Sequence, residues 1–324
     1  MRLLTDRPGL RLVAIEEPAA PRSVEYLLRF DTLLGHFPKP LRLVDEDRLE
    51  VNGRAVRLFP PIPGETPDWA ALGVSVVVEA SGRLHGRADL ERHLAAGAHR
   101  VVLCSPPSEP PDLTLVAGVN DELLDDSKRI VSVGSVTANC IGPVLKVLVA
   151  ELGVERAFLA SVHAYGNQLR LADVPAPDMR SGRAAAENII PQPTNADEVL
   201  SELLPELAGR VSGLAVHVPV PNGSVVDLTC WHPREVTVEE VNDVIRAAAA
   251  GDLRSILGFE DQPIVSSDIL MTKHSGVFDS LSTMVVAGRV SKTLTFYDNG
   301  WGYSHRVIEL LERFASMETA ETRS

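Results

Sequence analysis

Short apolar runs alternate with amphipathic helical patterns along the first 134 residues of the chain. Arg100–Leu103 and Ile130–Val133 are continuous apolar runs, as expected of buried parallel strands. Leu10–Ile15 and Ser75–Val78 also predict strands, and Ser23–Leu34 predicts an amphipathic helix that begins at a serine cap. This alternation of strands and helices predicts a βαβ layout.

The second half shows a different pattern. Asn139–Leu152 predicts a helix, and Gly166–Asn195 has no clear period, which predicts a long loop that is functional or at a subunit contact. A terminal helix is predicted from about Gly302 to Ala315. Long alternating strands beside few helices predict a mainly antiparallel sheet. The predicted strands are Arg156–Val162, Leu214–Val218, Ser224–Trp231, Met284–Val290 and Lys292–Tyr297.

Together these patterns predict an α/β protein. Residues 1–134 would form a Rossmann-like first domain, residues 135–301 an α+β catalytic-type domain, and residues 302–324 a helix returning to the first domain. A dinucleotide domain opens with a strand, a glycine-rich turn and a helix that holds the pyrophosphate. Only nine residues precede the strand at Leu10, so the opening strand and glycine loop are missing. Two explanations stay open, a misassigned start and a true loss of the cofactor site, and either leaves a sheet edge to be covered.

Composition narrows the class of partner. The net charge of −13 argues against nucleic acid or an anionic membrane as the main partner and leaves a small-molecule substrate. No apolar run reaches the roughly 18 residues that span a bilayer, and the N-terminus lacks a signal sequence. Three cysteines, an odd count, suggest reduced thiols and a cytoplasmic protein. Without cysteine pairs at ligand spacing or a His-Glu-x-x-His motif, no metal site is expected.

The most informative segment runs from Ser132 to Pro143 and reads SVGSVTANCIGP. It resembles the active-site segment of the glyceraldehyde-3-phosphate dehydrogenase family, in which the first of two cysteines attacks the aldehyde. Val136 stands at the position of that nucleophile. An isopropyl group cannot form a thiohemiacetal. The segment therefore predicts the family's scaffold without the atom that carries its covalent chemistry.

The resemblance extends over nearly the whole chain. It implies that His163 is the catalytic histidine, that Asn299 lies where the family holds the nicotinamide amide, and that Tyr303 lies beside the catalytic pocket. The segments that carry it are Phe30–Phe37, Glu79–Gly82, Cys104–Pro106, Ser161–Tyr165, Val218–Ser224 and Tyr297–Tyr303.

The departures from the family pattern cluster around that pocket. His217 replaces an arginine that clamps the substrate phosphate, and Gly166 replaces a threonine of the same site. Glu198 stands where the family has a lysine. The loss of a guanidinium and a hydroxyl, with an added acid, argues against a phosphorylated substrate.

Four residues are the candidate catalytic groups. His163 would be a general acid or base, supported by His217 and Tyr303, with Asn299 as an amide donor. Each assignment has an alternative. His163 would be a relic that packs in a cleft, His217 would be a neutral side chain that fills the space of the lost arginine, and Tyr303 would only pack in the domain contact. If NAD binds, Glu17, Ser81 and Asn299 would contact it.

The leading functional interpretation is a repurposed family member without the parent activity. It would be a biosynthetic tailoring enzyme that performs non-redox acid/base chemistry, such as cyclisation, dehydration or isomerisation, on a non-phosphorylated substrate and without a cofactor. One alternative is a non-catalytic pseudoenzyme or partner-binding subunit. Another is a dehydrogenase that binds NAD or NADP and acts without covalent catalysis, with a misassigned start. A homo-oligomer, dimer or tetramer, is expected because the family uses the second domain's sheet as its subunit interface.

Overall fold

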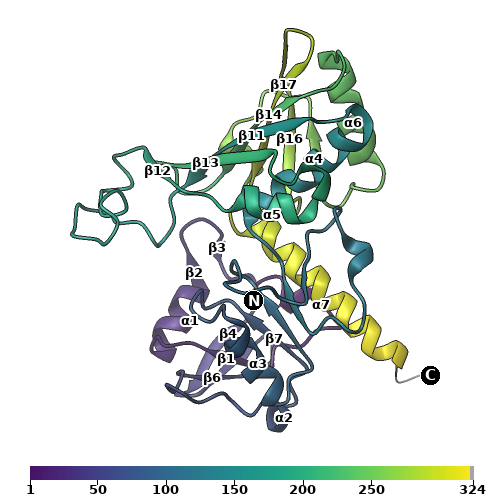
Figure 1. The fold of residues 1–324 in the computed structure, drawn as a ribbon. Helices are drawn as coiled ribbons and strands as arrows, with labels where there is room; N and C mark the ends of the chain where they lie inside the picture. The colour runs from purple at the N-terminus through teal and green to yellow at the C-terminus, as the bar shows by residue number, and fades with distance from the viewer. Residues whose placement is uncertain (322–324) are drawn as a thin grey trace. The chain divides into compact units, whose positions relative to one another are not determined.

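The structure is a computed structural model that describes residues 1–321 and divides into two compact units. The first unit consists of Met1–Leu113, Leu124–Val133 and the chain from Val307 onward. The second consists of Thr114–Leu123 and Gly134–Arg306. In Figure 1 the first unit is drawn mainly in purple and blue, together with the yellow C-terminal helix from Val307, and the rest of the chain in teal, green and yellow is mainly the second unit.

Two separate four-stranded sheets form the first unit. One has the order β1-β6-β5-β4, with β1 parallel to β6, and the other has the order β7-β8-β10-β9, with β7, β8 and β10 parallel. A two-stranded hairpin, β2-β3, lies apart from both. The elements are η1 (Leu4–Asp6), β1 (Ala14–Glu16), α1 (Pro21–Arg29), β2 (Phe30–Asp31), β3 (Gly35–His36), β4 (Leu41–Asp45), β5 (Arg48–Val51), β6 (Arg54–Phe59), α2 (Trp69–Leu72), β7 (Val76–Glu79), α3 (Arg87–Ala95), β8 (Arg100–Leu103), β9 (Leu113–Thr114) and β10 (Ile130–Ser132).

Strands β1 and β7 are edge strands of their sheets and are not hydrogen-bonded to each other within residues 1–321. Ala14 of β1 and Val77 of β7 nevertheless belong to one apolar cluster with Trp69, so the two sheets share packing. Ahead of β1 the described chain contains one short 3-10 helix, η1. The interrupted parallel sheet confirms the predicted Rossmann-like α/β class and the predicted open edge.

The first helix is shorter than the predicted Ser23–Leu34. It spans Pro21–Arg29 and begins with a proline, which is favoured at the first helical position. The side chain of Asp31 then accepts hydrogen bonds from the amides of Leu33 and Leu34, each at 2.8 Å. An aspartate that binds the amides two and three residues later stabilises a turn in place of a further helical turn, which ends the helix early.

One seven-stranded sheet forms the second unit, in the order β12-β13-β11-β14-β17-β16-β15. The pairs β11-β14, β14-β17 and β16-β17 are antiparallel, and β11-β13 and β15-β16 are parallel. This confirms the predicted, mainly antiparallel sheet. Its strands are β11 (Arg156–Ala164), β12 (Ile190–Gln192), β13 (Val211–Val218), β14 (Ser224–Trp231), β15 (Leu257–Glu260), β16 (Gly276–Val286) and β17 (Val290–Tyr297).

One strand of this sheet was misplaced by the sequence pattern. The prediction put a strand at Met284–Val290, whereas β16 ends at Val286. Ala287 and Gly288 both have positive φ, 50° and 68°, and form the tight turn into β17. The three residues 287–289 join the strands, and the amide of Arg289 donates to the carbonyl oxygen of Val286 at 3.3 Å, which closes a turn whose two central residues have positive φ.

Three helices pack on one face of the sheet, and the sequence predicted one of them. They are α4 (Val136–Leu152), α5 (Ala196–Leu203) and α6 (Val238–Ala250), and Figure 1 shows them beside the strands. Helix α6 begins with a capping box in which Thr237 and Glu240 exchange hydrogen bonds of 2.9 and 3.1 Å. That Thr-x-x-Glu spacing was the sequence signal for α6. The chain also contains η2 (Asp121–Leu123), η3 (Pro205–Leu207), η4 (Ser266–Ile269) and the terminal helix α7 (Trp301–Glu321), which is longer than predicted.

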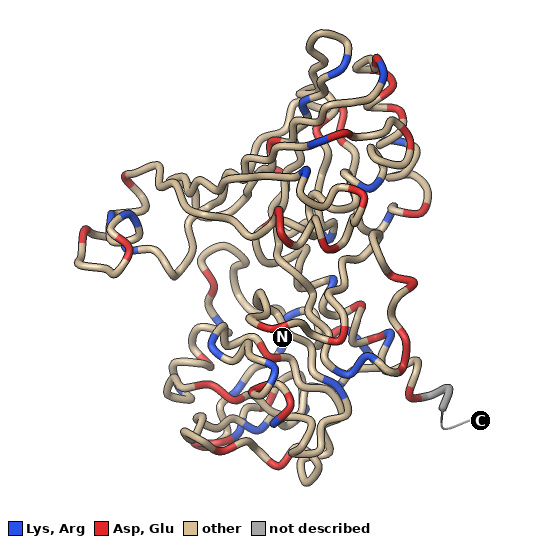
Figure 2. Tube along the Cα trace, in the orientation of Figure 1, with Lys and Arg blue, Asp and Glu red and all other residues tan. Residues whose placement is uncertain are grey.

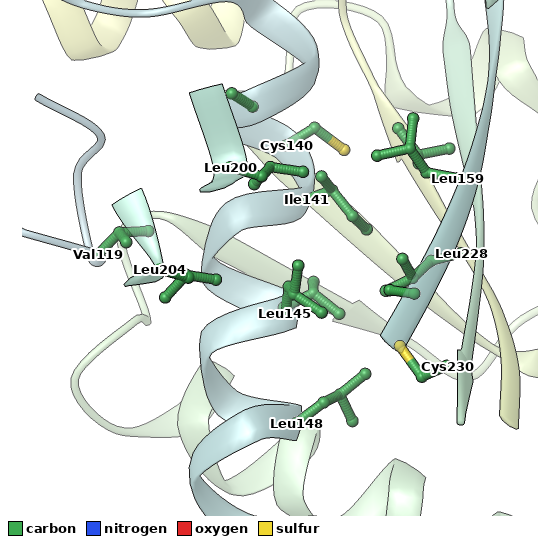
Figure 3. Packing of buried hydrophobic residues seen from close by; sticks show 14 of the residues in the cluster. Val119, Cys140, Ile141, Leu145, Leu148, Leu159, Leu200, Leu204, Leu228 and Cys230 are labelled. Atoms are coloured by element: carbon green, nitrogen blue, oxygen red, sulfur yellow. The ribbon is translucent and has the colours of Figure 1, made fainter. Parts of the chain in front are cut away.

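Helix α4 forms the centre of the core of the second unit. Ile141, Leu145 and Leu148 are fully buried on it and pack with Leu159 of β11 and Leu228 of β14, as Figure 3 shows. Because the same helix begins at Val136, this packing also fixes the backbone at the position that corresponds to the family's nucleophile.

Replacing Leu145 with alanine should lower the free energy of unfolding by about 2–5 kcal/mol, because a fully buried leucine leaves a cavity in a core that cannot fully collapse. Urea unfolding followed by circular dichroism measures the loss. Leu171→Ala is the matched control, since that side chain is 83% exposed and its truncation should change stability little. Equal effects of the two substitutions would contradict the assigned core.

The long loop predicted over Gly166–Asn195 is present, with the short strand β12 near its end. Figure 1 shows the loop, in teal, extending away from the seven-stranded sheet of its own unit. It exposes large apolar side chains, of which Met179 is 88% and Ile189 69% exposed. Apolar side chains held this far out of the core are typical of a contact surface.

Charged residues of both signs intermingle along the chain (Figure 2). Within residues 1–321, no helix combines the length and the apolar character needed to cross a membrane.

Candidate active site

The candidate site is built on the helix-covered face of the seven-stranded sheet. Side chains alternate between the two faces of a strand, so His163 of β11, His217 of β13 and Tyr297 of β17 point to the same side as the buried residues two positions before them. His163 and His217 are direct neighbours in the parallel β11-β13 ladder. The structure therefore brings together two of the four predicted catalytic residues.

His163 is held by one short hydrogen bond and one ring contact. Its Nδ1 lies 2.7 Å from the Tyr297 hydroxyl, and its ring stacks on that of His217 with 5.2 Å between centroids and 24° between planes. No hydrogen bond to Nε2 is found among the described residues, so that nitrogen remains available to a ligand. Burial, with a smaller contribution from His217, lowers the pKa of His163 to about 4, so the ring is neutral at pH 7.

The stability of the protein should depend on this depressed pKa. In the unfolded chain His163 takes up a proton near pH 6.5, whereas in the folded protein its pKa is about 4. The contribution of His163 to the free energy of unfolding is therefore fully present above pH 6.5 and is lost as the pH falls towards 4. His163→Gln should remove on the order of 1–2 kcal/mol of the stability difference between pH 7 and pH 5. Urea unfolding at both pH values measures it. The exposed His36→Gln is the control, and an unchanged pH dependence in His163→Gln would refute the assignment.

His217 is nearly buried, and burial lowers the pKa of its ring as well. Its Nδ1 is buried and has no hydrogen-bond partner among residues 1–321. A buried ring nitrogen without a partner costs free energy, which a bound ligand can recover. His217 therefore suits the predicted supporting role in substrate positioning.

Asn299 is placed by a polar network that follows β17. Asp298 accepts hydrogen bonds from the amides of Gly300 and Trp301, and Asn222 accepts one from the backbone amide of Asn299 at 3.1 Å. The Ser224 hydroxyl donates to Asn299 Oδ1 at 2.6 Å. This bond fixes the orientation of the side-chain amide and leaves its NH₂ group for another acceptor.

Tyr303 has a structural contact in the second unit. Its hydroxyl donates to the carbonyl oxygen of Gly134 at 3.2 Å, directly ahead of the cap residue Ser135. Tyr303 thus anchors the turn that leads into α4, which agrees with the packing alternative. Its predicted supporting role in catalysis stays a prediction.

Val136 is the first residue of α4 and packs partly against the core. The helix is capped by Ser135, whose Oγ accepts the amide of Ala138 at 3.1 Å. This is the position at a helix N-terminus where a thiol would be activated, yet the side chain is an isopropyl group.

None of the three cysteines is suited to replace that thiol. Cys140 points into the core (Figure 3), and burial raises the pKa of its thiol. Burial also raises the pKa of Cys230 and of Cys104 to about 12. In residues 1–321, no group of three or more histidine, cysteine, aspartate or glutamate side chains could hold a metal ion.

The predicted cofactor residues of the first unit lie at the carboxyl ends of its parallel strands. Glu17 follows β1, and its Oε1 accepts the amide of Ala19 at 3.1 Å. Ser81 follows β7, and its amide donates to Glu79 at 2.7 Å. Ser105, after β8, was not among the predicted residues, and its hydroxyl is buried without a hydrogen-bond partner among the described residues. Ligands of open α/β sheets bind beyond the carboxyl ends of the strands, so this orphaned hydroxyl fits a dinucleotide.

Comparison with known proteins then decides the family. The family model described as "Glyceraldehyde 3-phosphate dehydrogenase, NAD binding domain" matches residues 1–87, and that of the C-terminal domain matches residues 135–299. The chain belongs to the glyceraldehyde-3-phosphate dehydrogenase family. It is 40% identical to the glyceraldehyde-3-phosphate dehydrogenase of Geobacillus stearothermophilus over 97% of this chain and 94% of that protein. It is 41% identical to that of Mycobacterium leprae over 93% of this chain and 89% of that protein.

These matches correct two interpretations. The repurposed enzyme with non-redox chemistry is wrong, because relatives at about 40% identity over nearly the whole chain are named as dehydrogenases. The expectation that no cofactor binds is also wrong, because the matched first domain is an NAD-binding domain. The matches to both domains outweigh the absence of a glycine-rich turn ahead of Leu10 in the sequence. The comparisons lend no support to a pseudo-dehydrogenase or to secondary metabolism.

Sequence reasoning missed Tyr297. The segment Tyr297–Tyr303 carries part of the resemblance to the family, but no role was predicted for Tyr297 itself. The signal was the alternation of β17, in which Ser291, Thr293, Thr295 and Tyr297 are buried, so the hydroxyl of Tyr297 required a partner.

Proposed function

We propose that this chain is an NAD-dependent dehydrogenase that oxidises an aldehyde without a covalent intermediate on the protein. One observation carries the proposal: the catalytic-type histidine is retained and held by Tyr297, while Val136 occupies the position of the nucleophile. The names of the relatives, which are dehydrogenases of glyceraldehyde 3-phosphate, make that aldehyde the first substrate to test.

The chain's own residues suggest how the reaction proceeds. Since no sulfur can attack the carbonyl carbon at Val136, water would add to RCHO and give the hydrate RCH(OH)₂. Loss of a hydride from its carbon and of a proton from a hydroxyl group, with the proton passing to solvent water, would then give RCOOH. Bound NAD would supply the hydride acceptor. His163 is neutral at pH 7 and presents Nε2, and a hydrogen bond from this position would stabilise negative charge on the hydrate oxygen. His217 and Asn299 would orient the substrate.

The residues expected to hold the cofactor are Glu17, Ser81 and Ser105 for its adenosine part, and Asn299 for the nicotinamide amide. Glu16 ends β1 and Glu17 follows it, so two neighbouring carboxyl groups lie at the end of this strand. Burial raises the pKa of Glu16, and the nearby Glu79 adds to the rise. An acidic residue at this place binds a ribose hydroxyl and repels a 2′-phosphate, which favours NAD over NADP.

Calorimetric titration tests the cofactor proposal. NAD should bind at least about tenfold more tightly than NADP, equivalent to about 1.4 kcal/mol. Glu17→Gln should weaken NAD binding and reduce the preference, because it removes the charge that recognises the ribose. Glu46→Gln, in an exposed turn, is the matched control. The absence of NAD binding, or equal affinity for NADP, would refute this assignment.

A homo-oligomer, dimer or tetramer, is part of the proposal. The face of the seven-stranded sheet opposite the helices exposes Phe158 by 41% and Leu214 by 40%. Exposed apolar side chains on one face are typical of a subunit interface. The net charge of −13 supports a small-molecule substrate over a nucleic acid.

A further inference from the structure

We infer that Tyr297 is a positioning residue that donates its hydroxyl hydrogen to Nδ1 of His163 and thereby fixes the neutral ring with its hydrogen on Nε2. His163 would then act as a hydrogen-bond donor to the reacting oxygen, and not as a base. This role rests on the proposed function, but the arrangement of hydrogens can be measured without it.

The strand order explains how Tyr297 reaches His163. Strand β14 lies between β17 and β11, and Ser224 of β14 is the direct register partner of Tyr297. The small side chain at Ser224 leaves room for the phenol to extend across β14 towards β11. There the hydroxyl meets His163 Nδ1 at 2.7 Å and Ser161 Oγ at 3.2 Å.

The two distances indicate where the single phenol hydrogen lies. The Tyr297 hydroxyl lies 2.7 Å from His163 Nδ1 and 3.2 Å from Ser161 Oγ, so the shorter contact to the histidine is the better place for the phenol hydrogen. A phenol is also a more acidic donor than a neutral imidazole N–H, and an imidazole nitrogen is the stronger acceptor. The consistent chain runs from the Ser161 hydroxyl to the Tyr297 oxygen, and from the Tyr297 hydroxyl to His163 Nδ1.

The environment of Tyr297 keeps this donor protonated. The side chain is 1% exposed, and burial raises the pKa of its hydroxyl, although neighbouring hydroxyl groups such as that of Ser161 oppose the rise. A tyrosinate is therefore disfavoured, and the hydrogen stays available for His163. A neutral histidine that donates a hydrogen bond to a substrate oxygen is an established means of stabilising developing negative charge.

The tautomer of His163 is consistent with valine at position 136. Water addition at an aldehyde needs a donor that stabilises the resulting oxyanion. The arrangement Ser161–Tyr297–His163 supplies the donor. In this chain the histidine and the valine are thus chemically compatible.

Nitrogen-15 NMR of histidine-labelled protein tests the inference directly, with His163 assigned by the signal lost in His163→Gln. The wild type should show His163 protonated at Nε2 at pH 7. Tyr297→Phe, which keeps the ring but removes the donor, should shift His163 towards the other tautomer or a mixture. Tyr26→Phe, on the exposed side of α1, is the control and should change nothing.

Kinetics supply the second measurement. Tyr297→Phe should lower kcat at least tenfold with little change in KM, because the hydroxyl acts through His163 and not on the substrate. Circular dichroism confirms that the variant is folded. A wild-type His163 protonated at Nδ1, or a Tyr297→Phe variant with unchanged tautomer and kcat, would overturn the inference. If the predicted tautomer is found but no aldehyde yields NADH, the inference stands and the proposed function fails.

Discussion

His163→Ala is expected to lower kcat for NADH formation from the aldehyde by about 10²–10³-fold, the loss that follows removal of one preorganised hydrogen-bond donor. The reason is structural: His163 is neutral, its Nδ1 is bound to Tyr297, and its Nε2 has no hydrogen-bond partner among the described residues. Steady-state kinetics with NAD and glyceraldehyde 3-phosphate measure the effect.

His217→Ala is the companion variant and should mainly raise KM, because His217 is expected to orient the substrate and not to stabilise the oxyanion. NAD affinity should be unchanged in both variants, which separates a catalytic loss from a loss of cofactor. If His163→Ala retains the wild-type rate while circular dichroism shows an intact fold, His163 has no catalytic role.

Val136→Cys should raise the oxidation rate, by on the order of 10²-fold, which corresponds to about 2.7 kcal/mol of barrier. Position 136 begins α4, where the helix N-terminus lowers the pKa of a thiol, and a thiolate there could attack the aldehyde carbon. The phosphate ligands replaced at His217 and Gly166 would still limit the gain for a phosphorylated substrate.

Val136→Ala is the matched control, because it opens a similar space without a nucleophile. Alkylation with iodoacetamide gives an independent measure. Cys140 and Cys230 are buried, and burial raises the pKa of the Cys104 thiol to about 12, so the cysteine variant should gain one fast-reacting thiol. Equal rates in the cysteine and alanine variants would show that the remaining site cannot use a covalent route.

Much of the architecture could be predicted from local pattern alone. Continuous apolar runs such as Arg100–Leu103 marked the buried parallel strands, and long alternation marked Ser224–Trp231. Errors arose where a side chain or a turn overrode periodicity. Asp31 ended the first helix early, and the positive φ at Ala287 and Gly288 moved a strand boundary. These effects depend on individual hydrogen bonds and backbone dihedral angles, which the periodicity of hydrophobic residues does not predict.

The candidate site was predicted only in part for a related reason. The motif around His163 identified the histidine, but its partner lies 134 residues away and reaches it across an intervening strand. Such a contact follows from strand order and register, which one sequence does not specify. The expectation that no cofactor binds was wrong because it rested on the glycine-rich turn alone, whereas the match to an NAD-binding domain extends over residues 1–87.

Transfer of hydrogen from substrate to cofactor tests the central claim most directly. Glyceraldehyde 3-phosphate carrying deuterium on its aldehyde carbon is incubated with the protein and NAD, and the cofactor is analysed by mass spectrometry. A dehydrogenase must place that deuterium on the nicotinamide, so we predict deuterated NADH in the wild type and a loss of about 10²–10³-fold in its rate of formation in His163→Ala. Conversion of the aldehyde without label in the cofactor, or label formed equally fast by His163→Ala, would contradict the account.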